Sequence, residues 1–115
     1  MTAGEKITQE IIDWYTTEFP TYKGTGIGRP LGEFKETLEW RNGEITLPSG
    51  VAKAVESFGG EGLGDRTWFV FDVNGALYRA EGSYTSWDGD DWSYSNIDEV
   101  EAVQVMVTKY QKKRV

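Results

Sequence analysis

The fold is decided by residues 67–84, which read TWFVFDVNGALYRAEGSY. Two runs of bulky apolar residues flank Asn74-Gly75, a pair that tolerates the positive φ angles of a tight two-residue turn. Such a turn predicts an antiparallel hairpin of residues 67–73 and 76–84. The residues paired on one face are Val73 with Ala76, Phe71 with Tyr78, and Phe69 with Ala80.

The other face of this hairpin carries Trp68, Val70, Leu77 and Arg79. Both faces of residues 67–73 are therefore apolar. Strands buried on two sides have this composition, so we expect residues 67–73 to lie centrally in the sheet with cover on each side.

A single helix is expected at residues 5–19. Thr2 and Glu5 fit a capping box before it, and Pro20 ends it. Apolar side chains recur at spacings of three and four and give one stripe. They are Ile7, Ile11, Trp14, Tyr15 and Phe19. The opposite side is expected to be solvated, and it carries Gln9, Glu10, Asp13 and Thr17.

The remaining elements are expected to be short. Residues 34–40 and 44–47 predict a second hairpin around Asn42-Gly43, and residues 49–58 predict a short helix with Ser49 as N-cap. A last strand is predicted at residues 100–110, where valines alternate with other residues. The connecting loops are residues 21–33, 59–64 and 85–96.

These elements together predict an α+β fold in one domain, residues 1–115. We expect an antiparallel sheet of four to five strands built from hairpins, with the N-terminal helix packed on one face. A chain of 115 residues can bury a core without disulfides or metals. Five Trp, six Tyr and five Phe supply much of that core.

The composition narrows the functional classes. The chain has no cysteine and no histidine, which removes disulfides, thiolate metal sites and the commonest general base. No apolar run approaches the roughly 20 residues of a membrane span, and the first residues do not resemble a signal peptide, so we expect a cytoplasmic protein.

The charge is unevenly distributed along the chain. The formal net charge is −7, and residues 80–108 contain seven acids and no Lys or Arg. The last residues reverse the sign with Lys109, Lys112, Lys113 and Arg114. An acidic surface repels nucleic acid, so we expect no direct binding to DNA or RNA.

Three motifs that could carry chemistry do not meet its requirements. The run Gly24-x-Gly-x-Gly28 follows a helix and lacks the Gly-Lys-Ser/Thr ending of a phosphate loop. A calcium loop counted from Asp88 would need an oxygen ligand and a glycine where Trp92 and Ser93 stand. Neighbouring acids such as Asp90 and Asp91 point apart, and no Ser or Thr has a base at a recognisable spacing. We therefore expect no catalysis, no cofactor and no metal.

Residues 84–94 interleave aromatic and acidic side chains. The rings are Tyr84, Trp87, Trp92 and Tyr94, and the acids are Asp88, Asp90 and Asp91. One or two of the rings could instead cap the core. Rings that stay exposed predict a protein-binding surface, with Trp87 or Trp92 as anchor and an acidic rim that attracts a basic partner.

The last third of the chain also carries a set of recognisable short motifs. They are Asn74-Gly75-Ala-Leu77-Tyr78-Arg79, Gly82-Ser-Tyr84-x-Ser86, Asp88-Gly89 and Val105-Met-Val107-Thr-Lys-Tyr110. In these motifs the chain resembles small accessory proteins of tailed bacteriophages. That resemblance implies an interaction protein, acting in the host cytoplasm, that binds and inhibits a host protein.

Two functions are therefore expected as alternatives. In the first, the acidic aromatic surface binds a basic host protein, such as a nucleic-acid-handling or defence enzyme. In the second, the protein binds a small ligand in a pocket between the sheet and the glycine-rich loops. The sequence does not indicate an oligomeric state.

Overall fold

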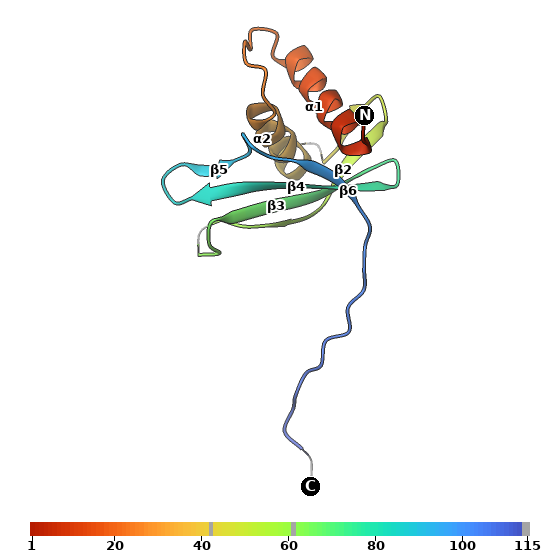
Figure 1. Ribbon diagram of the computed structural model, residues 1–115, viewed down its shortest axis with the longest axis vertical. Helices are drawn as coiled ribbons and strands as arrows, with labels where there is room; N and C mark the ends of the chain where they lie inside the picture. Colours follow the sequence, from red (N-terminus) through yellow and green to blue (C-terminus); the bar gives the residue numbers. More distant parts are fainter. Residues whose placement is uncertain (42, 61, 114–115) are drawn as a thin grey trace.

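The computed structural model describes residues 1–41, 43–60 and 62–113, and in it two helices lie on one face of an antiparallel sheet (Figure 1). The strand order is β1-β2-β3-β4-β5, and β6 also pairs with β4. The predicted α+β class is confirmed, with six strands and a second helix. The elements are α1 (Ala3–Glu18), α2 (Gly28–Glu36), the π-helix η1 (Thr37–Arg41), β1 (Ile45–Leu47), β2 (Gly50–Phe58), β3 (Arg66–Val73), β4 (Ala76–Thr85), β5 (Gly89–Asp91) and β6 (Ile97–Val100).

The β3–β4 hairpin has the predicted register. Val73 pairs with Ala76, and Phe71 pairs with Tyr78. Asn74 and Gly75 take φ angles of +52° and +89°, as a two-residue turn of this type requires. The Asp72 carboxylate accepts a hydrogen bond of 3.2 Å from the Gly75 N–H. This turn fixes which side chains face the helices.

Helix α1 also forms as predicted. The Thr2 hydroxyl accepts from the Glu5 N–H at 3.1 Å, and the Glu5 side chain accepts in return from the Thr2 backbone. Ile7, Ile11 and Tyr15 are buried. The apolar stripe therefore packs on the sheet, as its spacing indicates.

Residues 34–40 are helical, so the strand predicted there and its hairpin are wrong, whereas the short strand predicted at residues 44–47 is confirmed as β1. Helix α2 runs directly into η1, and Leu31, Phe34 and Leu38 are all buried. Their spacings of three and four are helical, and this pattern outweighs the strand-like composition. The predicted loop at residues 21–33 therefore ends at residue 27. Of the expected turn, Asn42 lies outside the described residues.

The predicted helix at residues 49–58 is a strand instead. β2 pairs with β1 on one side, where Leu47 meets Gly50 across a two-residue turn, and with β3 on the other. Val51 and Val55 are β-branched and favour the pleated conformation. Pairing with a central strand decides the outcome, because tertiary contacts override weak helix propensity.

Only one face of the central strand is covered by another element of the described chain. Phe69 and Phe71 are buried beneath the helices, and the Phe34 ring meets Phe71 edge-on at 5.1 Å. Trp68 and Arg79 on the opposite face are half-buried. The Arg79 guanidinium lies 4.9 Å from the Trp68 ring centre, so long side chains shield this face themselves. The predicted cover on both sides is therefore wrong.

The predicted last strand is also wrong, because regular pairing ends at Val100. β6 pairs with β4 in a register that sets Ile97 opposite Ala80 and Val100 opposite Leu77. β4 begins at Ala76, so the chain beyond residue 101 passes the end of its partner. Residues 101–113 form no helix or strand, are exposed, and extend away from the sheet (Figure 1).

Glu10 is buried, although the pattern of α1 predicts it on the solvated side. Its side chain is 7% exposed. The Ser49 backbone N–H donates to Glu10 Oε1 at 2.8 Å, and the Ser49 hydroxyl donates to Oε2 at 2.5 Å. The carboxylate thereby ties α1 to the turn between β1 and β2.

Replacing Glu10 with alanine should lower the free energy of unfolding. Glu10→Ala leaves the half-buried Ser49 donors without their acceptor, and the expected loss is about 1–3 kcal/mol in urea denaturation. Gln9→Ala, on the exposed side of the same helix, is the matched control and should change stability by less than about 0.5 kcal/mol. Equal effects of the two substitutions would show that the bonds to Ser49 do not stabilise the fold.

Candidate functional site

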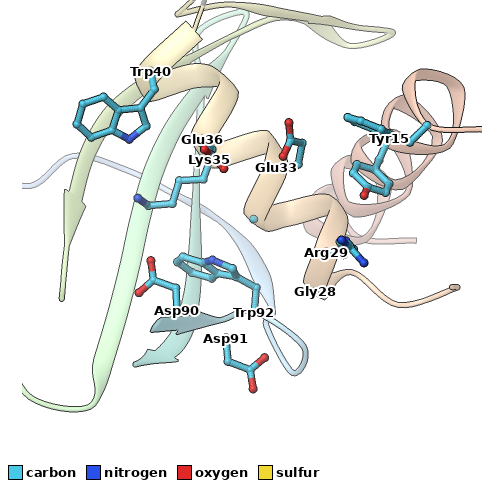
Figure 2. Close-up of a pocket in the computed structure, with 12 residues that line it drawn as sticks. Tyr15, Gly28, Arg29, Glu33, Lys35, Glu36, Trp40, Asp90, Asp91 and Trp92 are labelled. Atoms are coloured by element: carbon cyan, nitrogen blue, oxygen red, sulfur yellow. The ribbon is translucent and has the colours of Figure 1, made fainter. Parts of the chain in front are cut away.

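A groove lies between the helices and β5 (Figure 2). Its volume is about 780 Å³. One wall is α2 and η1, the other is β5, and the end of α1 closes one side. The side chains around it come from Tyr15, Phe19, Arg29, Glu33, Lys35, Glu36, Trp40, Asp90, Asp91 and Trp92.

The groove is acidic on balance. Four carboxylates and two cationic side chains line it. The Lys35 ammonium is bound to the Glu39 carboxylate at 3.0 Å, which offsets its charge. Trp40 is 80% exposed on the wall formed by the helices. The groove therefore combines a net negative charge with an exposed ring.

Trp92 forms the floor of the groove and belongs to the core. It is 4% exposed and meets Phe69 edge-on, with ring centres 5.5 Å apart. A Cβ on Gly82 would stand 2.7 Å from the Trp92 ring, and one on Gly32 would stand 3.5 Å from it. Glycine at position 82 therefore leaves room for the indole, whereas a Cβ at position 32 would make an ordinary van der Waals contact with it. Trp92 is therefore one of the rings that cap the core, and it offers no free anchor.

Helix α2 approaches the same segment through another glycine. A Cβ on Gly28 would stand 2.9 Å from the Ser93 Cα. Gly28 and Gly32 are four residues apart and so share one helix face. Part of the glycine-rich segment predicted as a loop therefore lies in α2. There its glycines let the helix pack closely against residues 92–93.

Trp87 is displayed at the tip of the β4–β5 hairpin. Thr85 pairs with Gly89, which leaves a three-residue turn with Trp87 at its centre. The Thr85 hydroxyl accepts from the Asp88 N–H at 3.2 Å, and Gly89 has a φ of +73°. Trp87 is 82% exposed. The turn therefore presents an indole on an ordered support.

Asp91 is held in its charged form by Ser93. The Ser93 hydroxyl, and its backbone N–H at 2.9 Å from Oδ1, both lower the pKa of Asp91. Because the pKa is lowered, this exposed carboxylate stays negative at a lower pH than an ordinary aspartate. Asp91 also borders a smaller hollow of about 350 Å³, shared with Tyr94.

The structure divides the seven residues that the sequence singles out. Trp92 is in the core, and Asp90 and Asp91 stand on β5 at the groove. Trp87, Asp88 and Tyr94 are exposed on turns beside it, and Tyr94 is 96% exposed. Tyr84 is half-buried in β4, opposite Asp90.

Sequence reasoning misses the other wall of the groove. Arg29, Lys35, Glu36 and Trp40 lie on α2 and η1, in residues predicted as loop and strand. The helical spacing of Leu31, Phe34 and Leu38 is the signal that could have placed them.

Comparison with protein-family models, with curated proteins and with solved structures finds no match to this chain. Within the described residues, no helix has the length and apolarity that a membrane crossing requires. The same residues contain no group of three or more acidic side chains placed to hold a metal ion.

The packing of Trp92 against Gly82 gives a stability prediction. In Gly82→Ala the new methyl group meets the indole and the Asp91 carbonyl, each 2.7 Å away, so the unfolding free energy should fall by about 1–3 kcal/mol. Gly26→Ala has nothing within 4 Å and should be nearly neutral. Urea denaturation measures both, and a neutral Gly82→Ala would contradict this packing.

The pKa of Asp91 gives a second prediction for this site. Ser93→Ala removes the hydroxyl donor and keeps the backbone N–H, so the pKa of Asp91 should rise part of the way to its ordinary value. An NMR pH titration of the Asp91 carboxyl carbon measures the change. Ser86→Ala, in the turn between β4 and β5, is the control. An unchanged Asp91 titration in Ser93→Ala would exclude the hydroxyl as the cause.

Proposed function

We propose that this protein is an interaction protein that binds a basic segment of another protein. The binding surface is the β4–β5 turn together with the adjoining rim of the groove. Trp87 acts as the anchor, and Asp88, Asp90 and Asp91 act as the acidic rim. Tyr94 extends the surface on the far side of Asp91, and Trp40 extends it on the far side of the groove.

The exposure of Trp87 is the observation that carries this proposal. A tryptophan that is 82% exposed leaves a large apolar surface in water. Hairpin pairing and the Thr85–Asp88 hydrogen bond hold its backbone, so binding costs little loop ordering. Tryptophan is also among the residues enriched at binding hot spots.

The charges around Trp87 indicate the chemistry of the partner. Asp88, Asp90 and Asp91 lie within four residues of the ring, and Glu33 and Glu36 line the groove beyond β5. Rim charges of one sign accelerate encounter with a partner of opposite sign. A basic protein segment therefore fits this surface better than a neutral or acidic one. The resemblance to phage accessory proteins further suggests that the partner is a host protein and that binding inhibits it.

Binding of a small ligand is the second candidate function. A volume of about 780 Å³ lies within the range of ligand pockets, roughly 300–1,000 Å³. Arg29 stands on the helix wall and could pair with an anionic ligand. A thermal-stability screen with metabolites and nucleotides tests this candidate, because a ligand of the folded state raises the melting temperature by mass action.

Two variants test the proposed function against the partner captured from bacterial lysate. Trp87→Ala should raise the dissociation rate about 30-fold or more, which corresponds to a hot spot of at least 2 kcal/mol. The triple variant Asp88→Asn, Asp90→Asn, Asp91→Asn should slow association and flatten its dependence on salt. Surface plasmon resonance separates the two rates.

A charge-matched control separates this surface from general acidity. Asp13→Asn, Glu18→Gln and Glu56→Gln together remove three exposed acids that lie on α1 and β2, away from the β4–β5 turn. This control should change association much less than the triple variant at the turn. If Trp87→Ala and the triple variant bind like the parent protein while circular dichroism shows an intact fold, the surface lies elsewhere.

A further inference from the structure

The segment after β6 has the sequence of a strand and no strand to pair with in the described chain. Val103, Val105 and Val107 alternate with polar residues or Met106 and are 72%, 76% and 72% exposed. Met106 and Tyr110 are 100% and 93% exposed. The segment cannot continue alongside β4, because that strand begins only at Ala76 and runs antiparallel to β6. Exposed alternation of this kind is typical of a strand that completes another sheet edge.

The same segment is complementary to itself in one antiparallel register. With Val105 opposite Val105 of a second copy, Val103 meets Val107 and Glu101 meets Lys109. The residues at the ends also match, since Val100 meets Tyr110. Cross-strand pairs of β-branched residues and of opposite charges both stabilise antiparallel strands.

Neighbouring registers lack this match. Centring the pair on Gln104 sets Glu101 against Val107, and centring it on Met106 sets Val103 against Lys109. The two registers centred between Val105 and either of its neighbours set the valines against even-numbered residues, among them Gln104 and Thr108, and none of the three valines meets a valine. Of these registers, only the one centred on Val105 pairs Val103, Val105 and Val107 with valines and also sets the acid opposite a base.

The overall charge favours the same partner. Residues 101–115 contain four basic residues and one acid, a net charge of +3. Because the whole chain has a net charge of −7, residues 1–100 carry −10. In this register Lys112 of one copy lies opposite Asp98 of the other. The basic residues of one C-terminal segment therefore meet the acidic residues of the other copy's β6. The two strongly acidic sheets stay at opposite ends of the paired segment, which limits their mutual repulsion.

We propose that residues 100–110 pair with the same residues of a second copy to form a two-fold symmetric dimer. An antiparallel pair of identical strands is isologous, so the contact closes and does not propagate into fibres. The ribbon joins the two sheets at their β6 edges. Two-stranded ribbons are marginally stable alone, so the dimer is expected to dissociate on dilution.

The other open edge of the sheet is less suited to receive this segment. β1 covers the outer edge of β2 only at residues 50–52. The rest of β2 is interrupted by a bulge between Ala54 and Glu56 and carries the charged residue Lys53. Bulges and charges are the features that keep edge strands from pairing.

Introduced thiols test the register directly, because the chain has no cysteine. Opposed Cα atoms in an antiparallel pair lie about 4.5–5.5 Å apart, within the range of a disulfide. Val105→Cys should therefore form a cross-linked dimer under mild oxidation, at least about tenfold faster than Gln111→Cys. In the proposed register the two thiols at position 111 stand at opposite ends of the ribbon. Equal rates on a non-reducing gel would overturn the proposal.

Charge exchange tests the pairing without oxidation. Glu101→Lys and Lys109→Glu should each weaken the dimer about tenfold at low salt, since each sets like charges opposite one another twice. An equimolar mixture of the two variants should recover the parent affinity, because each then meets its complement. Glu18→Lys makes the same charge change on α1 and should leave the dimer constant unchanged. Analytical ultracentrifugation measures the dimer dissociation constants of the two variants, of their mixture and of the Glu18→Lys control. A parent protein that stays monomeric up to millimolar concentration, or a mixture that fails to recover, would overturn the proposal.

Discussion

The structure depends on the register that the Asn74-Gly75 turn imposes on β3 and β4. That register places Phe69, Phe71 and Tyr78 on one face, where α1 and α2 cover them. Side chains alternate along a strand, so a slip of one residue would set Trp68 and Val70 against the helices instead. The ten residues of β4 then receive β5 at one end and β6 at the other, both on the same side. The groove and the exposed C-terminal segment are both consequences of the length of β4.

The elements that the sequence predicts correctly are those whose signals are local. The capping box at Thr2 and the turn at Asn74-Gly75 each satisfy their own backbone groups within a few residues. β2 and the end of β6 are decided by distant partners. Residues 50–58 form a strand because β3 offers a long edge, and residues 101–110 do not because β4 begins only at Ala76 and offers them no partner. The lengths of the partner strands β3 and β4 cannot be deduced from the sequence of either segment.

In the candidate site, too, local features can be predicted from the sequence, whereas features that depend on distant residues cannot. The sequence predicts that residues 84–94 are acidic and aromatic, but it does not tell which rings are buried. Trp92 is buried because Gly82 on β4 leaves space for its indole and Gly32 on α2 packs against it, and these glycines are 10 and 60 residues away in sequence. Trp87 remains exposed because a three-residue turn has no interior. The wall formed by α2 and η1 is harder to predict, because residues 34–40 have a strand-like composition although Leu31, Phe34 and Leu38 have helical spacing.

The two proposed surfaces lie at opposite ends of β4 and can act together. The turn that displays Trp87 follows Thr85, whereas the C-terminal segment leaves the sheet beside Leu77, at the other end (Figure 1). Self-association through Val105 therefore leaves both acidic turns open. A dimer would present two copies of the same binding surface, and a partner with two basic segments at a matching distance would be held by both. Linked sites bind more tightly than either alone because the second contact forms at a high effective concentration. Dilution of the dimer would then weaken partner binding although no residue that touches the partner has changed.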